Sequence, residues 1–290
     1  MNWADFGLGT WHPKGGMFEV VNAMTNLALE LGVTFRTNAG VEKIEVDSDG
    51  NAVGIVVDGV LEKSDYVLSG ADYHHTEQLL EPSYRQYSEK YWGKKILAPS
   101  ALLFYVAFDK KLRNVSHHTL FFDEEFDEHA KFIYDTPQWP KSPLFYASFS
   151  SITDDLLAPE GKEAATLLIP VASGLEDTEE IRAQYFDIII ERLERLTSQS
   201  LKGDILFQKS FCVKDFEKDY NSLKGNAYGL ANTLFQTAFL RPRIKSKKVP
   251  NLFFTGQLTV PGPGVPPALI SGKIASDSIL KFSKDERVIR

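Results

Sequence analysis

The chain has 290 residues, of which 43% are hydrophobic and 24% are charged, and its formal net charge is −7. This length is enough for one large domain or two moderate ones, and the negative charge argues against a general nucleic-acid binder. Cys212 is the only cysteine, which excludes an intrachain disulfide and a multi-cysteine metal cage and favours a reducing compartment.

The first quarter of the chain reads as a loop, a helix and a set of strands. Residues 1–16 are rich in glycine, tryptophan and proline, and apolar residues then recur at helical spacing from Met17 to Leu31, before Gly32. The pattern that follows predicts four short strands, at 33–36, 41–46, 52–57 and 65–69. Turns are expected at 47–50 and 58–59, and the strand at 65–69 is expected to be buried on both faces.

The middle of the chain is expected to begin with a weakly helical segment at about 73–92. Two strands, at 101–108 and 167–171, and a strong helix at about 177–196 are expected to follow. Asp177 and Glu180 form a capping-box-like start to the strong helix. Residues 100–150 are unusually aromatic. Such a region favours either an ordinary core or a wall against an apolar ligand.

Near the C-terminus, a strand at 252–255 is followed by a Gly/Pro loop and by a helix from about Pro266 to Leu280. Glycines let a backbone approach a ligand without a Cβ clash, and a helix N-terminus offers free N–H groups. The residues alone leave two interpretations open, a simple loop before a helix or a ligand-binding loop. On the second, the loop borders an open groove and the helix N-terminus is aimed into it.

The segment from Gly256 to Gly272 resembles the C-terminal signature of bacterial-type phytoene dehydrogenases, the carotenoid desaturase family. Shorter stretches resemble that family in the same order along the chain: 12–17 (HPKGGM), 69–72 (SGAD), 142–146 (SPLFY), 158–161 (APEG), 168–171 (LIPV), 235–236 (FQ) and 240–242 (LRP). The resemblance therefore covers essentially the whole chain.

The resemblance implies an FAD cofactor whose isoalloxazine ring and ribityl chain lie beside the final loop and helix. By motif position, it implies that the cofactor-binding residues are Gly256, Gln257, Pro261, Gly262, Gly264, Val265 and Pro266, with Val41 near the adenine end. It identifies no catalytic residue. No metal site is expected, because the adjacent pairs His74-His75 and His117-His118 diverge on a helix or strand and have no cysteine partner.

A complete member of that family carries a strand, a Gly-x-Gly-x-x-Gly turn and a helix that hold the FAD pyrophosphate. This sequence shows no such unit, because His12 stands where Gly7-Leu8-Gly9 would need a third glycine. We therefore expect an N-terminally truncated chain whose partner is the missing FAD-binding segment. Alone, the chain is expected to bind FAD weakly or not at all and to be inactive.

The expected architecture is α+β, the C-terminal portion of a two-domain, FAD-dependent, amine-oxidase-like flavoprotein. Residues 1–72 and 245–290 are expected to form a partial FAD-binding domain. Residues 73–244 are expected to form a substrate domain with a mixed or antiparallel sheet.

The resemblance implies an oxidoreductase acting on CH–CH groups that desaturates phytoene, an apolar polyene, in carotenoid biosynthesis. Three related activities stay open: a hydroxycarotenoid desaturase, a ketolase and an isomerase. From another class, a non-catalytic lipid-binding fragment also stays open, as does a degenerate product without function. We expect a cytoplasmic protein, with peripheral contact to the inner face of the membrane left as an open alternative.

Overall fold

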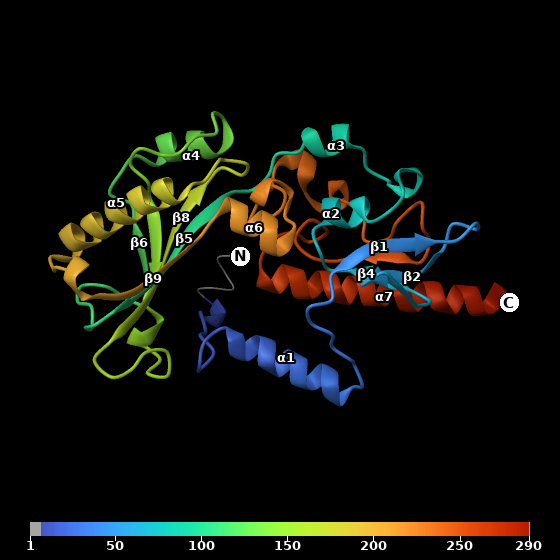
Figure 1. Cartoon of the computed structure of the whole chain (residues 1–290), viewed down its shortest axis with the longest axis horizontal. Coiled ribbons are helices and arrows are strands. Elements are labelled where there is room, and N and C mark those ends of the chain that lie inside the picture. The colour runs from blue at the N-terminus through green and yellow to red at the C-terminus, as the bar shows by residue number, and fades with distance from the viewer. Residues whose placement is uncertain (1–6, 290) are drawn as a thin grey trace.

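The structure is a computed structural model that describes residues 7–289, without the side chains of 285–289. Two lobes stand side by side, and helix α1 lies beneath them (Figure 1). The helices are α1 (Phe18–Glu30), α2 (Tyr73–Gln78), α3 (Glu89–Gly93), α4 (Phe126–Tyr134), α5 (Glu179–Thr197), α6 (Val213–Tyr220) and α7 (Val265–Ile289). The strands are β1 (Val41–Val46), β2 (Ala52–Val57), β3 (Val60–Lys63), β4 (Val67–Ser69), β5 (Ser100–Phe108), β6 (His118–Phe121), β7 (Phe145–Ser148), β8 (Glu163–Val171), β9 (Ile205–Phe211) and β10 (Leu252–Phe254).

One lobe is built on a five-stranded antiparallel sheet in the order β6-β7-β8-β5-β9. The central strands β5 and β8 pair along their whole length, from Ser100 opposite Val171 to Phe108 opposite Glu163. Side chains alternate between the two faces of a strand, and one face of this sheet forms a core with α5 (Figure 1). The predicted strands at 101–108 and 167–171 are confirmed, and β8 begins earlier than predicted.

Five phenylalanine rings of the 100–150 region belong to that core. The rings packed there are those of Phe104, Phe108, Phe121, Phe145 and Phe149. For these residues the ligand-wall interpretation is wrong, because they fill the space between the sheet and α5. Two tyrosines instead occupy the opposite face of the sheet, where Tyr105 is 40% exposed and Tyr146 is partly buried.

The other lobe contains an antiparallel meander, β1-β2-β3, and a parallel pair formed by β4 and β10. The predicted strands at 41–46 and 52–57 are confirmed. The predicted strand at 33–36 is wrong, because that segment belongs to no strand among the described residues. Burial of the fourth strand on both faces is also wrong, since Leu68 is 44% exposed.

The predicted domain boundaries at 72/73 and 244/245 stay predictions. Residues 1–6 and 290, at the two ends of the predicted FAD-binding domain, lie outside the described residues. The core of the second lobe draws on both sides of the first boundary. Tyr73 and Trp92 pack in one cluster with Ile44 and Leu252. The ring of Tyr73 also stacks on Phe254 with centroids 3.8 Å apart.

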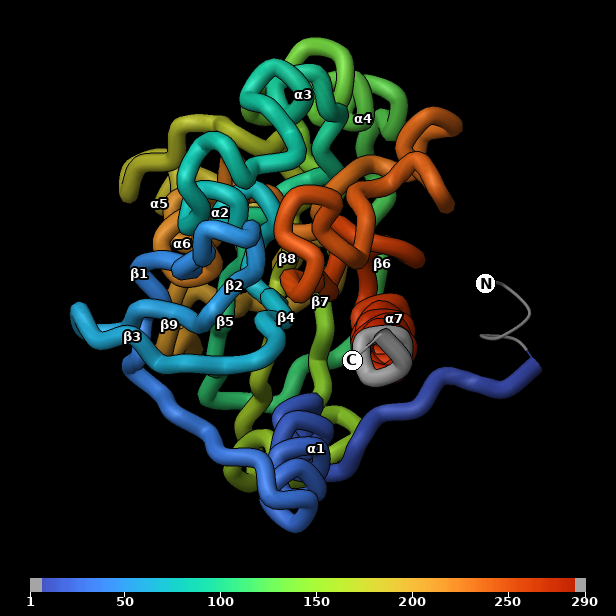
Figure 2. Tube along the Cα trace, turned by 90° about the vertical axis from the view of Figure 1, so that its right-hand side faces the viewer, coloured from blue at the N-terminus to red at the C-terminus, as the bar shows by residue number. Residues whose placement is uncertain are grey.

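Helix α1 confirms the predicted helix and ends one residue before Leu31, but none of its residues is buried. It is tied to the rest of the chain through the loop before it, where the Gly15 N–H donates to Asp154 Oδ2 at 2.6 Å. Figure 2 shows α1 below the ends of the five-stranded sheet. Within the described residues, no helix is both long and apolar enough to cross a membrane.

The strong helix predicted from Asp177 is α5, but its start differs from the prediction. Thr178 is the N-cap residue, and its side chain accepts a hydrogen bond from the Ile181 N–H. Asp177 is buried instead and pairs with Arg182 at 2.9 Å. A carboxylate one residue before the cap serves a buried ion pair here, which the capping pattern could not reveal.

Candidate functional site

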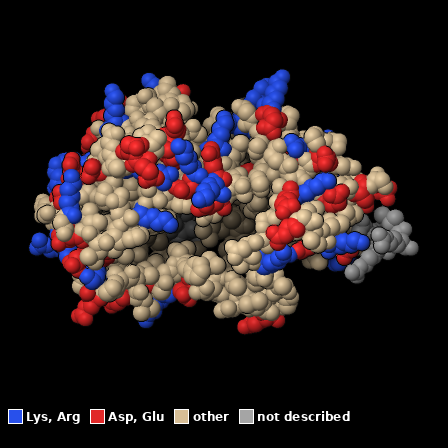
Figure 3. All heavy atoms as spheres, in the orientation of Figure 1, with Lys and Arg blue, Asp and Glu red and all other residues tan. Residues whose placement is uncertain are grey.

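The surface is hollowed between the two lobes (Figure 3). One cavity, here called the loop groove, has a volume of about 640 Å³. It is lined by three segments, namely 70–73, 216–228 and the Gly/Pro loop with the start of α7 at 255–268. The predicted placement of the Gly/Pro loop at the edge of an open groove is therefore confirmed.

The strand before this loop is fully buried, and the loop leaves it through a tight turn. Gly256 has a φ of +98°, a conformation that favours glycine. Ser271 of α7 holds the turn, because its hydroxyl accepts a hydrogen bond from the Gly256 N–H at 2.8 Å and lies 2.6 Å from Thr255 Oγ1. The first turn of α7 is thereby fixed beside the end of β10, so that Val265 and Ala268 line the groove.

A buried arginine supports the loop from behind. Arg241 is 3% exposed and donates to the backbone oxygens of Gln257 and Leu230, both at 3.2 Å, and to Asn232 Oδ1 at 2.6 Å. A Cβ on Gly262 would lie 3.0 Å from its Nη2, so the guanidinium occupies the space that a side chain there would need.

Arg241 has no carboxylate partner within the described residues, and its Nε has no hydrogen-bond acceptor there. Burial lowers the pKa of this guanidinium, which is still charged at neutral pH. Arg241 belongs to the Leu240-Arg241-Pro242 motif, but nothing in the sequence marks it as part of a site. An unpaired buried cation beside the loop favours electron-rich or anionic groups in the neighbouring groove.

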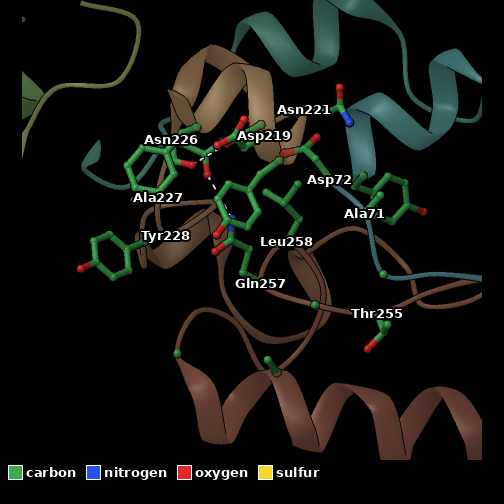
Figure 4. Close-up of a pocket in the computed structure, with 18 of the residues that line it drawn as sticks. Ala71, Asp72, Asp219, Asn221, Asn226, Ala227, Tyr228, Thr255, Gln257 and Leu258 are labelled. Atoms are coloured by element: carbon green, nitrogen blue, oxygen red, sulfur yellow. Dashed lines mark hydrogen bonds between the residues drawn. The ribbon is translucent and has the colours of Figure 1, made fainter. Parts of the chain in front are cut away.

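Polar groups converge on the opposite wall of the loop groove (Figure 4). Asp72 caps α2 by accepting from the backbone N–H of His74 at 2.9 Å, and it also accepts from the Leu223 N–H at 3.2 Å. Burial raises the pKa of Asp72, against the effect of these hydrogen bonds. Asn226 Oδ1 accepts from Gly229 N at 2.6 Å and from Gln257 Nε2 at 3.4 Å.

A second cavity of about 770 Å³, the strand groove, lies beside the meander and β4. Val41, Ile44 and Val67 contribute apolar surface to it, and His75 and Thr76 contribute polar groups. Burial lowers the pKa of His75, which favours its neutral form. Gly70, Ala71 and Asn221 line both cavities, so the two grooves are neighbours, and together they are here called the trough.

The trough gathers only some of the residues predicted to bind the cofactor. Gly256, Gln257, Gly264 and Val265 line the loop groove, and Val41 lines the strand groove. Pro261, Gly262 and Pro266 do not line either groove, and Gly262 packs against Arg241 instead. Their contact with a cofactor stays a prediction.

The Gly/Pro loop offers exposed backbone to a ligand in the loop groove. Gly256 and Gly264 present backbone at positive φ, with no protein atom closer than 3.3 Å to the position that a Cβ would take. The start of α7 and the Arg241 cation favour electron-rich atoms there. Across residues 7–289, no three His, Cys, Asp or Glu side chains gather closely enough to hold a metal ion.

Comparison with known proteins identifies the family of the chain. A family model described as flavin containing amine oxidoreductase matches residues 2–280. A carotenoid 3,4-desaturase of Haloarcula japonica is 41% identical over 282 residues, which are 97% of this chain and 57% of that protein. A zeta-carotene-forming phytoene desaturase of Myxococcus xanthus is 30% identical over 98% of this chain and 55% of its own length.

Among solved structures, an oxidoreductase from Methanosarcina mazei shares the fold with a TM-score of 0.64 at 16% identity. The match covers 91% of this chain and 55% of that one. The chain thus spans about half the length of the curated relatives it matches. With the family match extending over nearly all of its residues, the chain belongs to the flavin-containing amine oxidoreductase family.

Proposed function

We propose that the trough holds FAD, with the isoalloxazine ring and ribityl chain in the loop groove and the adenosine end in the strand groove near Val41. The observation that carries this proposal is that the two grooves lie next to each other and share Gly70 and Ala71, with the Gly/Pro loop lining one of them. A ligand with two separated ends needs two neighbouring sites of this kind. The family match supports a flavin as that ligand.

The residues present fit the cofactor in chemical terms. The Gly256 and Gln257 backbone and the first turn of α7 would hold the ring and ribityl end, since they present open backbone to the groove. In that turn Pro266 and Pro267 carry no N–H, and the Ala268 N–H donates to the Gly264 oxygen at 2.9 Å. Arg241 would keep the carbonyl of Gln257 turned away from the ligand, because it binds that oxygen from behind. When bound, FAD supplies the hydride acceptor.

We further propose that the whole protein desaturates a carotenoid-like apolar polyene. The names of the relatives support this substrate class, since one is a carotenoid 3,4-desaturase and the other a phytoene desaturase. The resemblance of the segment from Gly256 to Gly272 to phytoene dehydrogenases favours phytoene. The chain is 41% identical to the 3,4-desaturase and 30% identical to the phytoene desaturase. Desaturation of a carotenoid that already has a longer conjugated system than phytoene is therefore the second candidate.

Peripheral contact with a membrane from the cytoplasmic side is part of the same proposal. Its support is an apolar loop that projects from the surface, which is the orange loop at the upper right of Figure 2. Leu234, Phe235 and Phe239 in this loop are 80%, 78% and 90% exposed. Aromatic and aliphatic side chains of this kind suit insertion at a lipid interface, where a polyene is dissolved.

The experiment is product analysis on a fusion of this chain to the part of the Haloarcula japonica relative that the match leaves uncovered. The fusion is supplied with phytoene and, separately, with lycopene, and the products are separated and identified by their visible spectra. We expect a product with a longer conjugated system from one of the two substrates. A fusion that retains flavin but converts neither substrate would contradict the proposed activity, and one without flavin absorbance would favour a lipid-binding module.

A further inference from the structure

The segment 232–240, here called the apolar loop, exposes large apolar side chains although it is held firmly from within. Its most exposed side chains are those of Leu234, Phe235 and Phe239. Between them, the buried Gln236 bonds the backbone of Ile96, accepting from its N–H at 3.0 Å and donating to its oxygen at 2.8 Å. The exposed rings therefore belong to an anchored loop.

Arg241 closes the base of the apolar loop. Its guanidinium donates to the Leu230 oxygen at 3.2 Å and to Asn232 Oδ1 at 2.6 Å, which are both on the incoming side of the loop. It also donates to the oxygen of Gln257 at 3.2 Å, and Gln257 lines the loop groove. One buried side chain thus ties the apolar loop to the wall of the loop groove.

The sequence around the apolar loop is basic, although the whole chain has a net charge of −7. No aspartate or glutamate occurs in the stretch 220–276. The basic residues of that stretch are Lys224, Arg241, Arg243, Lys245, Lys247, Lys248 and Lys273. The stretch 90–108 also has no acidic residue, and its basic residues are Lys90, Lys94 and Lys95. Two segments that are distant in sequence therefore share the same sign of charge.

Backbone pairing brings these two stretches together. Leu97 and Leu230 form an antiparallel bridge next to the base of the apolar loop. Lys94 and Lys95 come just before this bridge and directly before Ile96, whose backbone the apolar loop binds. The two lysines therefore stand at the edge of the apolar loop.

A third cation is joined to the two lysines through stacked rings. The Arg243 N–H donates to the hydroxyl of Tyr87 at 3.2 Å. The ring of Tyr87 stacks on that of Tyr91 with centroids 4.3 Å apart, and Lys95 Nζ lies 4.3 Å from the centre of the Tyr91 ring. Arg243 and Lys94 are exposed, and Figure 3 shows basic side chains projecting at the top above α3.

These three cations have no internal counter-charge. Among the side chains that the structure describes, no carboxylate forms an ion pair with Lys94, Lys95 or Arg243. Glu89, the acidic residue next to them in sequence, instead lies 3.0 Å from His74. Unpaired cations beside exposed rings match a bilayer with anionic headgroups, because the rings enter the interface while the cations meet the phosphates.

We propose that the apolar loop, together with Lys94, Lys95 and Arg243, is a docking face for an anionic lipid bilayer. The inference rests on the membrane contact in the proposed function and names the lipid that this contact selects. A neutral bilayer would engage only the rings. A nucleic acid would match the cations but would leave Phe235 and Phe239 in water.

Docking at this face brings the loop groove close to the lipid. Tyr228 lines that groove and stands six residues before Leu234, so the extended chain between them spans at most about 20 Å. Arg241 fixes the relation between the two, since it binds both the base of the apolar loop and Gln257 of the groove. A polyene dissolved in the bilayer would therefore have a short path to the groove.

The test measures co-sedimentation of this chain with vesicles of phosphatidylcholine, with and without phosphatidylglycerol. A basic residue near an anionic leaflet strengthens binding about fivefold, so the triple variant Lys94→Gln, Lys95→Gln, Arg243→Gln should lose up to about 100-fold on anionic vesicles and nothing on neutral ones. The matched control is Lys14→Gln, Lys209→Gln, Lys281→Gln, which removes the same charge at exposed positions outside the two basic stretches and should keep most of the binding. Circular dichroism checks that both variants fold as wild type does.

Each other outcome would overturn the docking face. Equal binding of wild type to both kinds of vesicle would remove the lipid selectivity and leave the apolar contact of the proposed function standing. Absence of binding to either kind would overturn that contact as well, while flavin retention and products of the fusion are judged separately. Equal weakening by the two triple variants would show that overall charge acts instead of this face. Loss of the anionic preference in the fusion would show that protein covers the face, and tighter cation-dependent binding to a short single-stranded RNA would assign it to nucleic acid.

Discussion

Arg241 offers a direct test of how the Gly/Pro loop is held in place. In an Arg241→Met variant, the backbone oxygens of Gln257 and Leu230 lose their charged donor. Each buried acceptor left unsatisfied costs about 1–3 kcal/mol. Asn232 is exposed, so its side-chain oxygen can turn to water and adds little.

An opposing effect reduces this cost. The native protein buries a cation without a carboxylate partner, and removing that charge returns part of its desolvation penalty, while the methionine fills most of the space. We expect the hydrogen bonds to outweigh this gain and the variant to lose about 2–3 kcal/mol of unfolding free energy. Urea unfolding followed by circular dichroism measures the difference.

Two further variants separate this explanation from a general loss of stability. Arg243→Met changes an exposed arginine two residues away and should stay within about 0.5 kcal/mol of wild type. Gly262→Ala should destabilise wild type, because its Cβ would meet the guanidinium, but should cost less in the Arg241→Met background. If Arg241→Met were as stable as wild type, desolvation of the cation would dominate and the reasoning would be refuted.

Three other predictions follow from single features of the structure. Gly225 has a φ of +59° and a Cβ there would lie 2.4 Å from the Val213 oxygen, so Gly225→Ala should cost at least about 2 kcal/mol by urea unfolding. Gly203→Ala, with no atom within 4 Å, is the control, and equal costs for the two would contradict the steric argument. The pKa of Asp154 is lowered mainly by the hydrogen bond that its carboxylate accepts from the Gly15 N–H. The ionised carboxylate therefore stabilises the fold above its unfolded-state pKa of about 3.9, and this contribution is lost as the pH falls through the folded-state pKa. The difference in unfolding free energy between wild type and Asp154→Asn should therefore be largest above about pH 4 and should shrink on acidification. A difference that does not change with pH would show that the ionised carboxylate does not stabilise the fold through the Gly15 N–H. The double variant Phe235→Ser, Phe239→Ser should reduce co-sedimentation with phosphatidylcholine vesicles severalfold, whereas Phe122→Ser, which changes another exposed ring, should not. Unchanged vesicle binding of the double variant would exclude this loop as the membrane contact.

The sequence predicted those parts of the fold whose signals are local. The strands that became β5 and β10 are apolar runs, and the helix that became α7 begins where prolines follow a Gly/Pro loop. The segment 33–36 has the same local preference for a strand, but pairing depends on a neighbour that sequence alone does not specify. Strands β3, β6 and β7 were missed because each has only four residues. Strand β9 has seven residues and was missed because its sequence, ILFQKSF, does not alternate regularly between apolar and polar residues.

The candidate site was predicted only in part, because its geometry depends on contacts between distant segments. The Gly/Pro loop could be found from its residues, whereas its partner wall could not. Parallel pairing of Leu252 with Val67 brings the loop beside Gly70, across about 185 residues of chain. Arg241 carries no local sign of burial, since an arginine before a proline is usually exposed. Its role follows only from the carbonyl oxygens that surround it.

The central claim is that the trough binds FAD with the ring end at the Gly/Pro loop. The most direct measurement is the flavin retained per chain after gel filtration of the fusion, read from visible absorbance. We expect about one flavin per chain for the wild-type fusion. Ala268→Trp, which places an indole in the loop groove, should lose it, whereas Ser276→Trp, on an exposed position of the same helix, should keep it. Full flavin retention by Ala268→Trp would contradict the account.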